Sequence, residues 1–200
     1  MVRTVLFDLG GVLVRFETER IVENFCRIVG DGPDEMREIV LGHLKAEFED
    51  GTRSPEAFRD AIATALNCEL SEEEFVPLWS DCFEANEPML EFFGQVRQTH
   101  RTLILSNTDP YHLQWILERW PVLAECDGMA LSYELGVRKP APAFFEAANN
   151  RFALTPSQCL YIDDLPDNVQ AGHTAGYQSI LYEDADQVLA KIKPLLRMQE

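Results

Sequence analysis

Acidic residues stand directly after two short apolar runs, and they are the first residues in the chain that suggest chemistry. The run 5–7 leads into Asp8, and the run 160–162 leads into Asp163 and Asp164. An aspartate before a glycine-containing turn, taken alone, is more often structural. Two adjacent carboxylates at the end of a buried strand repel each other unless a cation lies between them, and such hard oxygen ligands suit Mg²⁺. The acidic pair therefore predicts a metal site.

Two further positions could bind an anion. The apolar run 103–105 ends in Ser106 and Asn107, and a hydroxyl followed by backbone amides suits a phosphate oxygen. Taken alone, this segment is more often a helix cap or a turn. Lys139 precedes Pro140, which we expect to begin a helix, so Lys139 is either a cation for an anionic ligand or an ordinary solvated lysine.

The elements that must position these residues follow from the hydrophobic pattern. Short apolar runs separated by helical patterns predict βαβ units and a parallel sheet that helices cover on both faces. Asp109 and Thr155 each precede a proline and are predicted helix N-caps, and Gly176 is a predicted helix stop. Ligands of such sheets bind beyond the carboxyl ends of the strands. The predicted strands span residues 4–7, 102–105, 128–131, 159–162 and 178–182.

The interval between the first two strands is far longer than the about 10–12 residues of a minimal crossover. It shows apolar residues at helical spacing over 21–29, a helix start at Ser54-Pro55 and a capping box from Ser71 to Glu74. No strand is predicted within it. We therefore expect a helical domain over residues 15–85, inserted into an α/β core formed by residues 1–14 and 86–200.

Composition narrows the classes of partner. The 200 residues hold 34 acidic and 17 basic side chains, a formal net charge of −17, which argues against nucleic acid and anionic membranes as partners. The five cysteines are scattered without a C-x-x-C pair, as in a reducing compartment. No apolar run approaches the about 20 residues of a membrane span, and the first acid comes too early for a signal peptide. We expect a cytoplasmic protein.

Taken in order, the segments Phe-Asp-Leu-Gly-Gly-Val, Leu-Ser-Asn-Thr, Gly-Val-Arg-Lys-Pro and Tyr-Ile-Asp-Asp resemble the four motifs of haloacid dehalogenase-like (HAD) hydrolases. The resemblance covers nearly the whole chain, and the inserted helices resemble that family's C1 cap. It implies a Rossmann-like parallel sheet. Within the family, the chain is similar to bacterial sugar-phosphate phosphatases of the glucose-1-phosphatase kind, which implies a small phosphorylated metabolite as substrate.

The resemblance also implies a role for each motif residue. Asp8 would be the nucleophile, forming an aspartyl-phosphate, and a ligand of Mg²⁺ together with the Gly10 carbonyl and Asp164. Asp163 would support the metal through water or bind it directly. Ser106 and the Asn107 amide would hold phosphoryl oxygens, and Lys139 would bridge Asp8 and the phosphate.

Gly10 is where the chain departs from the commonest family pattern, Asp-x-Asp. The second aspartate of that pattern protonates the leaving oxygen and later activates water, and general acid–base catalysis contributes about 10²–10⁴-fold. Turnover here would be slow, would use another proton donor, or would favour good leaving groups.

Two alternatives to a phosphatase remain. A haloacid dehalogenase also attacks with an aspartate but needs no metal, and the pair Asp163-Asp164 counts against it. A catalytically inactive phosphate-binding protein would account for Gly10, but the presence of Asp8, Ser106 and Lys139 counts against that alternative.

Overall fold

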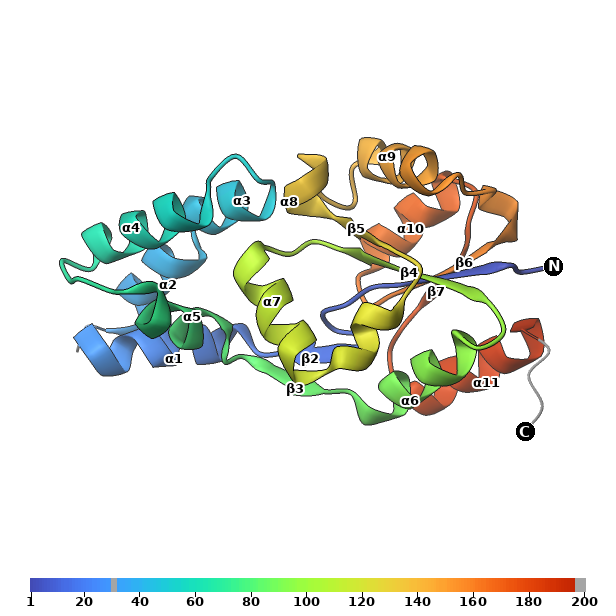
Figure 1. The fold of residues 1–200 in the computed structure, drawn as a ribbon, viewed down its shortest axis with the longest axis horizontal. Coiled ribbons are helices and arrows are strands. Elements are labelled where there is room, and N and C mark those ends of the chain that lie inside the picture. Colours follow the sequence, from blue (N-terminus) through green and yellow to red (C-terminus); the bar gives the residue numbers. More distant parts are fainter. Residues whose placement is uncertain (30–31, 197–200) are drawn as a thin grey trace.

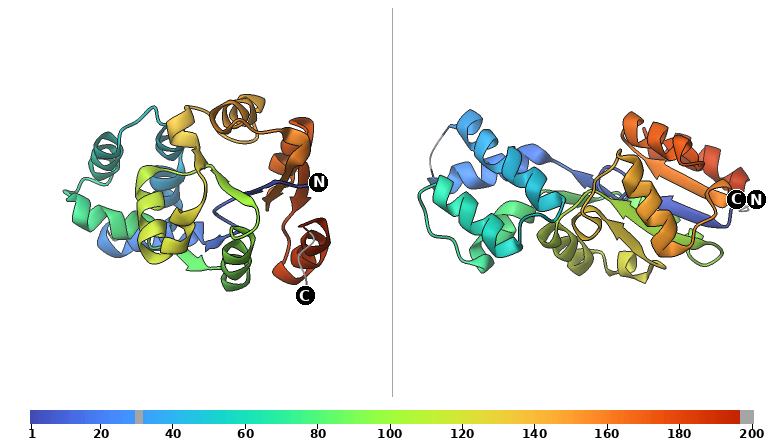
Figure 2. Two further views of the ribbon diagram at one scale, coloured as in Figure 1. Left: turned by 45° about the vertical axis from the view of Figure 1, so that its right-hand side comes forward. Right: turned by 90° about the horizontal axis from the view of Figure 1, so that it is seen from above.

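The computed structural model describes residues 1–29 and 32–196. It has a β-sheet flanked by helices at one end and a separate group of helices at the other (Figures 1 and 2). The main sheet is parallel and has the strand order β5-β4-β1-β6-β7. Its strands are β1 (Thr4–Phe7), β4 (Arg101–Ser106), β5 (Met129–Leu131), β6 (Cys159–Asp163) and β7 (Gln178–Leu181). All five predicted strands are thus confirmed, and so is the fold class.

Alternation along β1 divides the core into two layers. Leu6 lies opposite Leu103 and Tyr161 in the register and packs in one layer, whereas Val5 and Phe7 belong to the other. Helices α9 (Pro142–Phe152) and α10 (Pro166–Thr174) cover the Leu6 face. Helices α6 (Glu87–Val96) and α11 (Ala185–Leu196) cover the other face, as Figure 1 shows.

The helical end has a separate apolar core, and we call this group the helical layer. Phe25, Phe48, Phe58 and Phe75 are fully buried there. The capping box at Ser71 and the N-cap at Ser54 are both present, as predicted. The helices are α1 (Thr18–Val29), α2 (Pro33–Leu41), α3 (His43–Glu49), α4 (Pro55–Ala65) and α5 (Glu72–Ser80).

The expectation that this interval contains no strand is wrong. Strands β2 (Val14–Phe16) and β3 (Phe83–Ala85) form a two-stranded antiparallel ribbon where the chain leaves and re-enters the main sheet, with Phe16 opposite Phe83. Each strand is only three residues long, and its partner is remote in sequence. Neither strand can therefore produce a readable alternation by itself.

Two helix starts also differ from their predictions. Lys139-Pro140 lies in a turn, and α9 begins two residues later at Pro142, because the Lys139 backbone is hydrogen-bonded to Asn107. Thr155 precedes only a short 3₁₀ helix (Pro156–Gln158), and its side chain makes no cap hydrogen bond. Asp109 does cap α7 (Pro110–Arg119), and Gly176 has a positive φ just after α10.

No helix in the described part of the chain is long and apolar enough to cross a membrane.

Candidate active site

The carboxyl ends of β1, β4 and β6 bring the predicted site residues together around one buried ammonium group. The Lys139 Nζ lies 2.9 Å from Asp8 Oδ1 and 2.7 Å from Asp163 Oδ2, and it donates to the Leu105 carbonyl at 2.8 Å. Its side chain is 1% exposed, so it is not an ordinary solvated lysine. These three contacts use all three ammonium donors.

Asn107 places the backbone that carries this lysine. Its side-chain amide donates to the Lys139 carbonyl at 2.9 Å, and its Oδ1 accepts from the Lys139 N–H at 2.8 Å. This pair of bonds connects the end of β4 to the loop before α9. The side chain of Asn107 therefore positions Lys139, a role that its motif did not reveal.

The Asp163 carboxylate accepts hydrogen bonds from four protein donors. Its Oδ2 accepts from Lys139 and from the Tyr161 hydroxyl, and its Oδ1 accepts from the Leu165 N–H and the Asn168 amide, both at 2.9 Å. Both oxygens are therefore occupied by donors from the protein. Sequence reasoning missed Tyr161 and Asn168, although Tyr161 lies two residues before Asp163 on the same strand, which places the two side chains on one face.

Asp164 points toward the glycine turn that follows β1. Carboxylate oxygens of Asp8, Asp163 and Asp164 lie within 4.8 Å of one another. Gly11 makes this approach possible, since it has φ +83° and a Cβ there would lie 2.3 Å from Asp164 Oδ2. Asp164 is half-buried, so its carboxylate remains open to a cation.

Electrostatics at this edge favour a further positive charge. Burial and the nearby Asp163 raise the pKa of Asp8 well above its ordinary value, against the opposing effect of Lys139. Burial and the same neighbour also raise the pKa of Asp164. Although burial alone would raise the pKa of Asp163, Lys139 lowers it. A cation between Asp8 and Asp164 would relieve the cost of ionising both.

A small pocket joins this edge to the helical layer and the ribbon. Gly10, Ser106 and Asn107 line it from the sheet, and Phe16 and Glu49 line it from the other side. Its volume is about 50 Å³, which is room for a few water-sized groups. The phosphate-binding candidates therefore face a small cavity.

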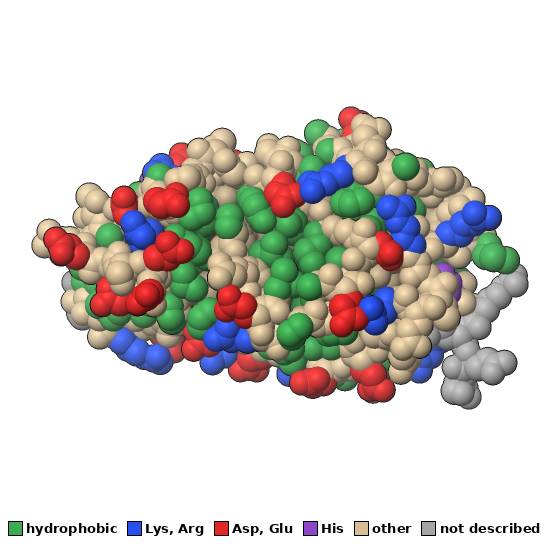
Figure 3. All heavy atoms as spheres, in the orientation of Figure 1, with side chains coloured by type: hydrophobic (Ala, Val, Ile, Leu, Met, Phe, Trp, Pro, Cys, Tyr) green, Lys and Arg blue, Asp and Glu red, His purple; other side chains and the backbone are tan. Residues whose placement is uncertain are grey.

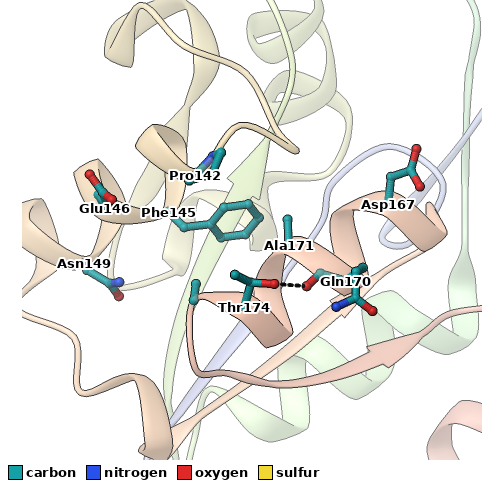
Figure 4. Close-up of a pocket in the computed structure, with 9 residues that line it drawn as sticks. Pro142, Phe145, Glu146, Asn149, Asp167, Gln170, Ala171 and Thr174 are labelled. Atoms are coloured by element: carbon teal, nitrogen blue, oxygen red, sulfur yellow. Dashed lines mark hydrogen bonds between the residues drawn. The ribbon is translucent and has the colours of Figure 1, made fainter.

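Larger hollows lie elsewhere on the surface, and two of them have volumes of about 400 and 460 Å³. The first is a groove between α9 and α10, and Figure 4 shows Phe145 and Ala171 along it and Asp167 at one end. Figure 3 shows apolar side chains gathered over α7, where Leu113 and Leu117 line a second hollow. Neither contains any of the predicted site residues.

Comparisons with known proteins agree with this architecture. A family model described as haloacid dehalogenase-like hydrolase matches residues 2–176. A D-ribitol-5-phosphate phosphatase from Bacteroides thetaiotaomicron is 28% identical over 92% of this chain and 93% of its own length. A phosphoglycolate phosphatase from Xanthomonas campestris is 25% identical over 89% of this chain and 81% of its own length. The crystal structure of a HAD family enzyme from B. thetaiotaomicron, in complex with magnesium and inorganic phosphate, superposes with a TM-score of 0.83 at 25% identity, covering 94% of this chain and 99% of that one.

The parallel sheet and its carboxylate-rich edge define an α/β protein with a candidate cation site, and the family model and the phosphatase relatives identify it as a hydrolase. The chain belongs to the haloacid dehalogenase-like hydrolases.

Proposed function

We propose that this hydrolase is a magnesium-dependent phosphomonoesterase in which Asp8 is the nucleophile. The observation that carries the proposal is the position of the Asp8 carboxylate, which is buried, 2.9 Å from the Lys139 ammonium and near the half-buried Asp164. A carboxylate that attacks a phosphate dianion needs the combined negative charge neutralised. The Lys139 ammonium, together with a cation bound at Asp164, would neutralise it.

The donor set fits Mg²⁺. Asp8, Asp164 and the Gly10 carbonyl would hold the ion, which prefers carboxylate and carbonyl oxygens and keeps some of its waters. When bound, Mg²⁺ supplies charge neutralisation and orientation for the phosphoryl group. Because both Asp163 oxygens already accept from the protein, we assign Asp163 to holding Lys139, and to the metal only through water.

The chain's own residues then perform two steps. Asp8 attacks phosphorus, and the ester oxygen leaves with its electron pair and takes a proton from solvent. The Ser106 hydroxyl and the Asn107 backbone amide hold the phosphoryl oxygens while Lys139 offsets their charge. Water then attacks the phosphorus of the aspartyl-phosphate and loses a proton to solvent. Inorganic phosphate leaves, and the Asp8 carboxylate is restored.

We further propose that residues 15–85 form a cap over a core of residues 1–14 and 86–200. The pocket of about 50 Å³ lies between the sheet and the helical layer, so movement of this layer away from the sheet would admit a sugar phosphate. Closure would then exclude water from the Asp8 site.

The substrate we propose is a small sugar or polyol phosphate. The relative that acts on D-ribitol 5-phosphate is alignable over 92% of this chain, which supports this class. The net charge of −17 argues against nucleic acid. The five cysteines are free, in keeping with the cytoplasmic location we propose.

A panel of phosphate monoesters, assayed for released phosphate with Mg²⁺ and with EDTA, tests this function. We expect hydrolysis with Mg²⁺, almost none in EDTA, and almost none from Asp8→Asn under either condition. Halide release from a 2-haloacid that persists in EDTA would support a dehalogenase instead. Phosphate binding without any turnover would support an inactive binding protein.

A further inference from the structure

The pocket above Ser106 contains one carboxylate that the proposed chemistry does not use. Glu49, at the end of α3, lines this pocket together with Gly10 and the aromatic pair Phe16 and Phe83. Of the described residues that line the pocket, Glu49 is the one acidic side chain. It belongs to the helical layer, so it faces the part of a substrate that lies beyond the phosphoryl group.

Glu49 is held in a fixed position by three contacts. Its Oε1 accepts from Lys45 on the same helix, and its Oε2 accepts from Arg138 at 2.9 Å. Its backbone carbonyl accepts from the Ser132 hydroxyl at 2.5 Å. The side chain is only 11% exposed. A long side chain that is already ordered loses little further entropy when it binds a ligand.

Of this cluster, Glu49 lines the pocket, whereas its partners Lys45 and Arg138 do not. The other titratable side chain among the described lining residues is His112, whose two ring nitrogens already contact Asp109 and the Trp79 carbonyl. Each carboxylate oxygen of Glu49 accepts one N–H from the pairs above and keeps capacity for another donor. A hydroxyl can supply that donor, whereas an ionised carboxylate has no hydrogen to donate and leaves that capacity unfilled.

The aromatic walls suit the same kind of group. Phe16 and Phe83 stack with their ring centroids 5.2 Å apart and line the pocket beside Glu49. Apolar faces of this kind pack against the C–H surface of a carbon chain whose hydroxyls point elsewhere.

We propose that Glu49 determines specificity by accepting hydrogen bonds from the hydroxyls of a neutral polyol or sugar leaving group and by rejecting leaving groups that carry a carboxylate. This inference rests on the proposed phosphatase function and names its substrate class. It predicts that D-ribitol 5-phosphate is preferred over phosphoglycolate, although phosphatases with either name occur among the relatives.

The test compares kcat/KM for D-ribitol 5-phosphate, phosphoglycolate and an aryl phosphate in the wild type, Glu49→Gln and Glu49→Ala. Glu47→Gln is the matched control, because Glu47 lies on the same helix, pairs with Arg53 and does not line the pocket. We expect Glu49→Gln to lower the ratio of ribitol phosphate to phosphoglycolate activity by about tenfold or more, the scale of one hydrogen bond to a charged group. Glu47→Gln should leave this ratio unchanged.

If Glu49 had a purely structural role, its replacement would lower all three activities together and leave their ratio unchanged, and this result would overturn the inference. A wild type that prefers phosphoglycolate would also overturn it. If Glu49→Gln fails to fold, the same ratio is read from Glu49→Ala and from the inhibition constants of free ribitol and glycolate on the wild type. Tighter inhibition by glycolate would then overturn the inference. Failure of the proposed function is distinguishable, since the wild type would then not hydrolyse even the aryl phosphate.

Discussion

At the scale of single residues, the proposed catalysis depends on Lys139 as the cation between two carboxylates. Replacing it by alanine leaves Asp8 and Asp163 facing each other without a counter-charge and removes a donor beside the phosphoryl site. We expect Lys139→Ala to lower kcat/KM by about 10²–10³-fold, comparable to loss of one oxyanion-hole donor. Lys191→Ala, an exposed change on α11, is the control. A decrease within about threefold, under about 0.7 kcal/mol, would show that Lys139 does not act on the transition state.

Gly10 offers the second test at this scale. A Cβ at Gly10 has no neighbour within 4 Å, and its φ lies outside the left-handed region, so the backbone there accepts a residue with a β-carbon. Without an acid–base group at this position, we expect breakdown of the Asp8 phosphoenzyme to limit turnover of an aryl phosphate, giving a burst of the aryl alcohol and then a slow steady rate. Gly10→Asp should raise the steady rate by about 10²-fold and abolish the burst.

Gly10→Ala separates the carboxylate from the mere presence of a side chain and should keep the burst. A wild type with a linear time course would mean that another group already activates the water, or that the first step is the slower one.

The sequence predicted which residues form this site better than it predicted the hydrogen bonds between them. The site residues were identifiable because each lies at or just after the end of a buried strand or within a motif, and parallel strands end at the same edge of the sheet. These residues are Asp8, Ser106, Lys139, Asp163 and Asp164. The contacts of Asp163 with Tyr161 and Asn168 depend on side-chain directions across two elements, which no local pattern carries. The metal-binding and catalytic roles of the predicted site residues stay predictions.

At the scale of elements, a buried ion pair in the first turn of α7 is hydrogen-bonded to Trp79 of α5. His112 Nδ1 lies 3.0 Å from Asp109 Oδ2, and the Trp79 indole N–H donates to the same oxygen at 3.1 Å. The His112 Nε2 lies 3.0 Å from the Trp79 carbonyl. Although burial lowers the pKa of His112, the adjacent Asp109 raises it to about 10.

This ion pair makes stability depend on pH. Because the folded pKa of His112 exceeds its ordinary unfolded value of about 6.5, the pair stabilises fully below about pH 6.5 and its contribution is lost as the pH rises through about 10. We expect the free energy of unfolding of the wild type to exceed that of His112→Gln by a few kcal/mol at pH 6.5, and this difference to shrink toward pH 10.

Urea denaturation across this pH range measures the difference, with His173→Gln on the exposed face of α10 as the control. A difference that stays constant from pH 6.5 to 10 would show that His112 is neutral in the folded protein.

Elements with a local signature were predictable, and those that depend on remote partners were not. The capping box at Ser71 and the N-cap at Asp109 lie entirely within short segments, so the sequence reveals them. The ribbon of β2 and β3 needs Phe16 to find Phe83, so only the assembled fold shows it. Helix α9 begins at Pro142 and not at Pro140 because a contact from β4 holds the preceding turn.

At the scale of the whole molecule, the net charge of −17 opposes the binding of any phosphate ester. Salt screens this repulsion, since the Debye length falls to about 8 Å at physiological ionic strength. We therefore expect kcat/KM for an anionic ester to rise about two- to fivefold as NaCl increases from about 20 to about 200 mM at fixed Mg²⁺. A neutral osmolyte at equal osmolarity is the control. A fall with salt would show that local cations dominate the encounter.

The central claim is that Asp8 becomes phosphorylated in a metal-dependent reaction, and acid quenching during turnover tests it most directly. Wild-type protein and Asp8→Asn would each be mixed with an aryl phosphate in Mg²⁺ or in EDTA, quenched, digested and analysed by mass spectrometry. We expect one added phosphoryl group on the Asp8 peptide of the wild type in Mg²⁺ only. Hydrolysis by Asp8→Asn at the wild-type rate, or a phosphoryl group on a different peptide, would contradict it.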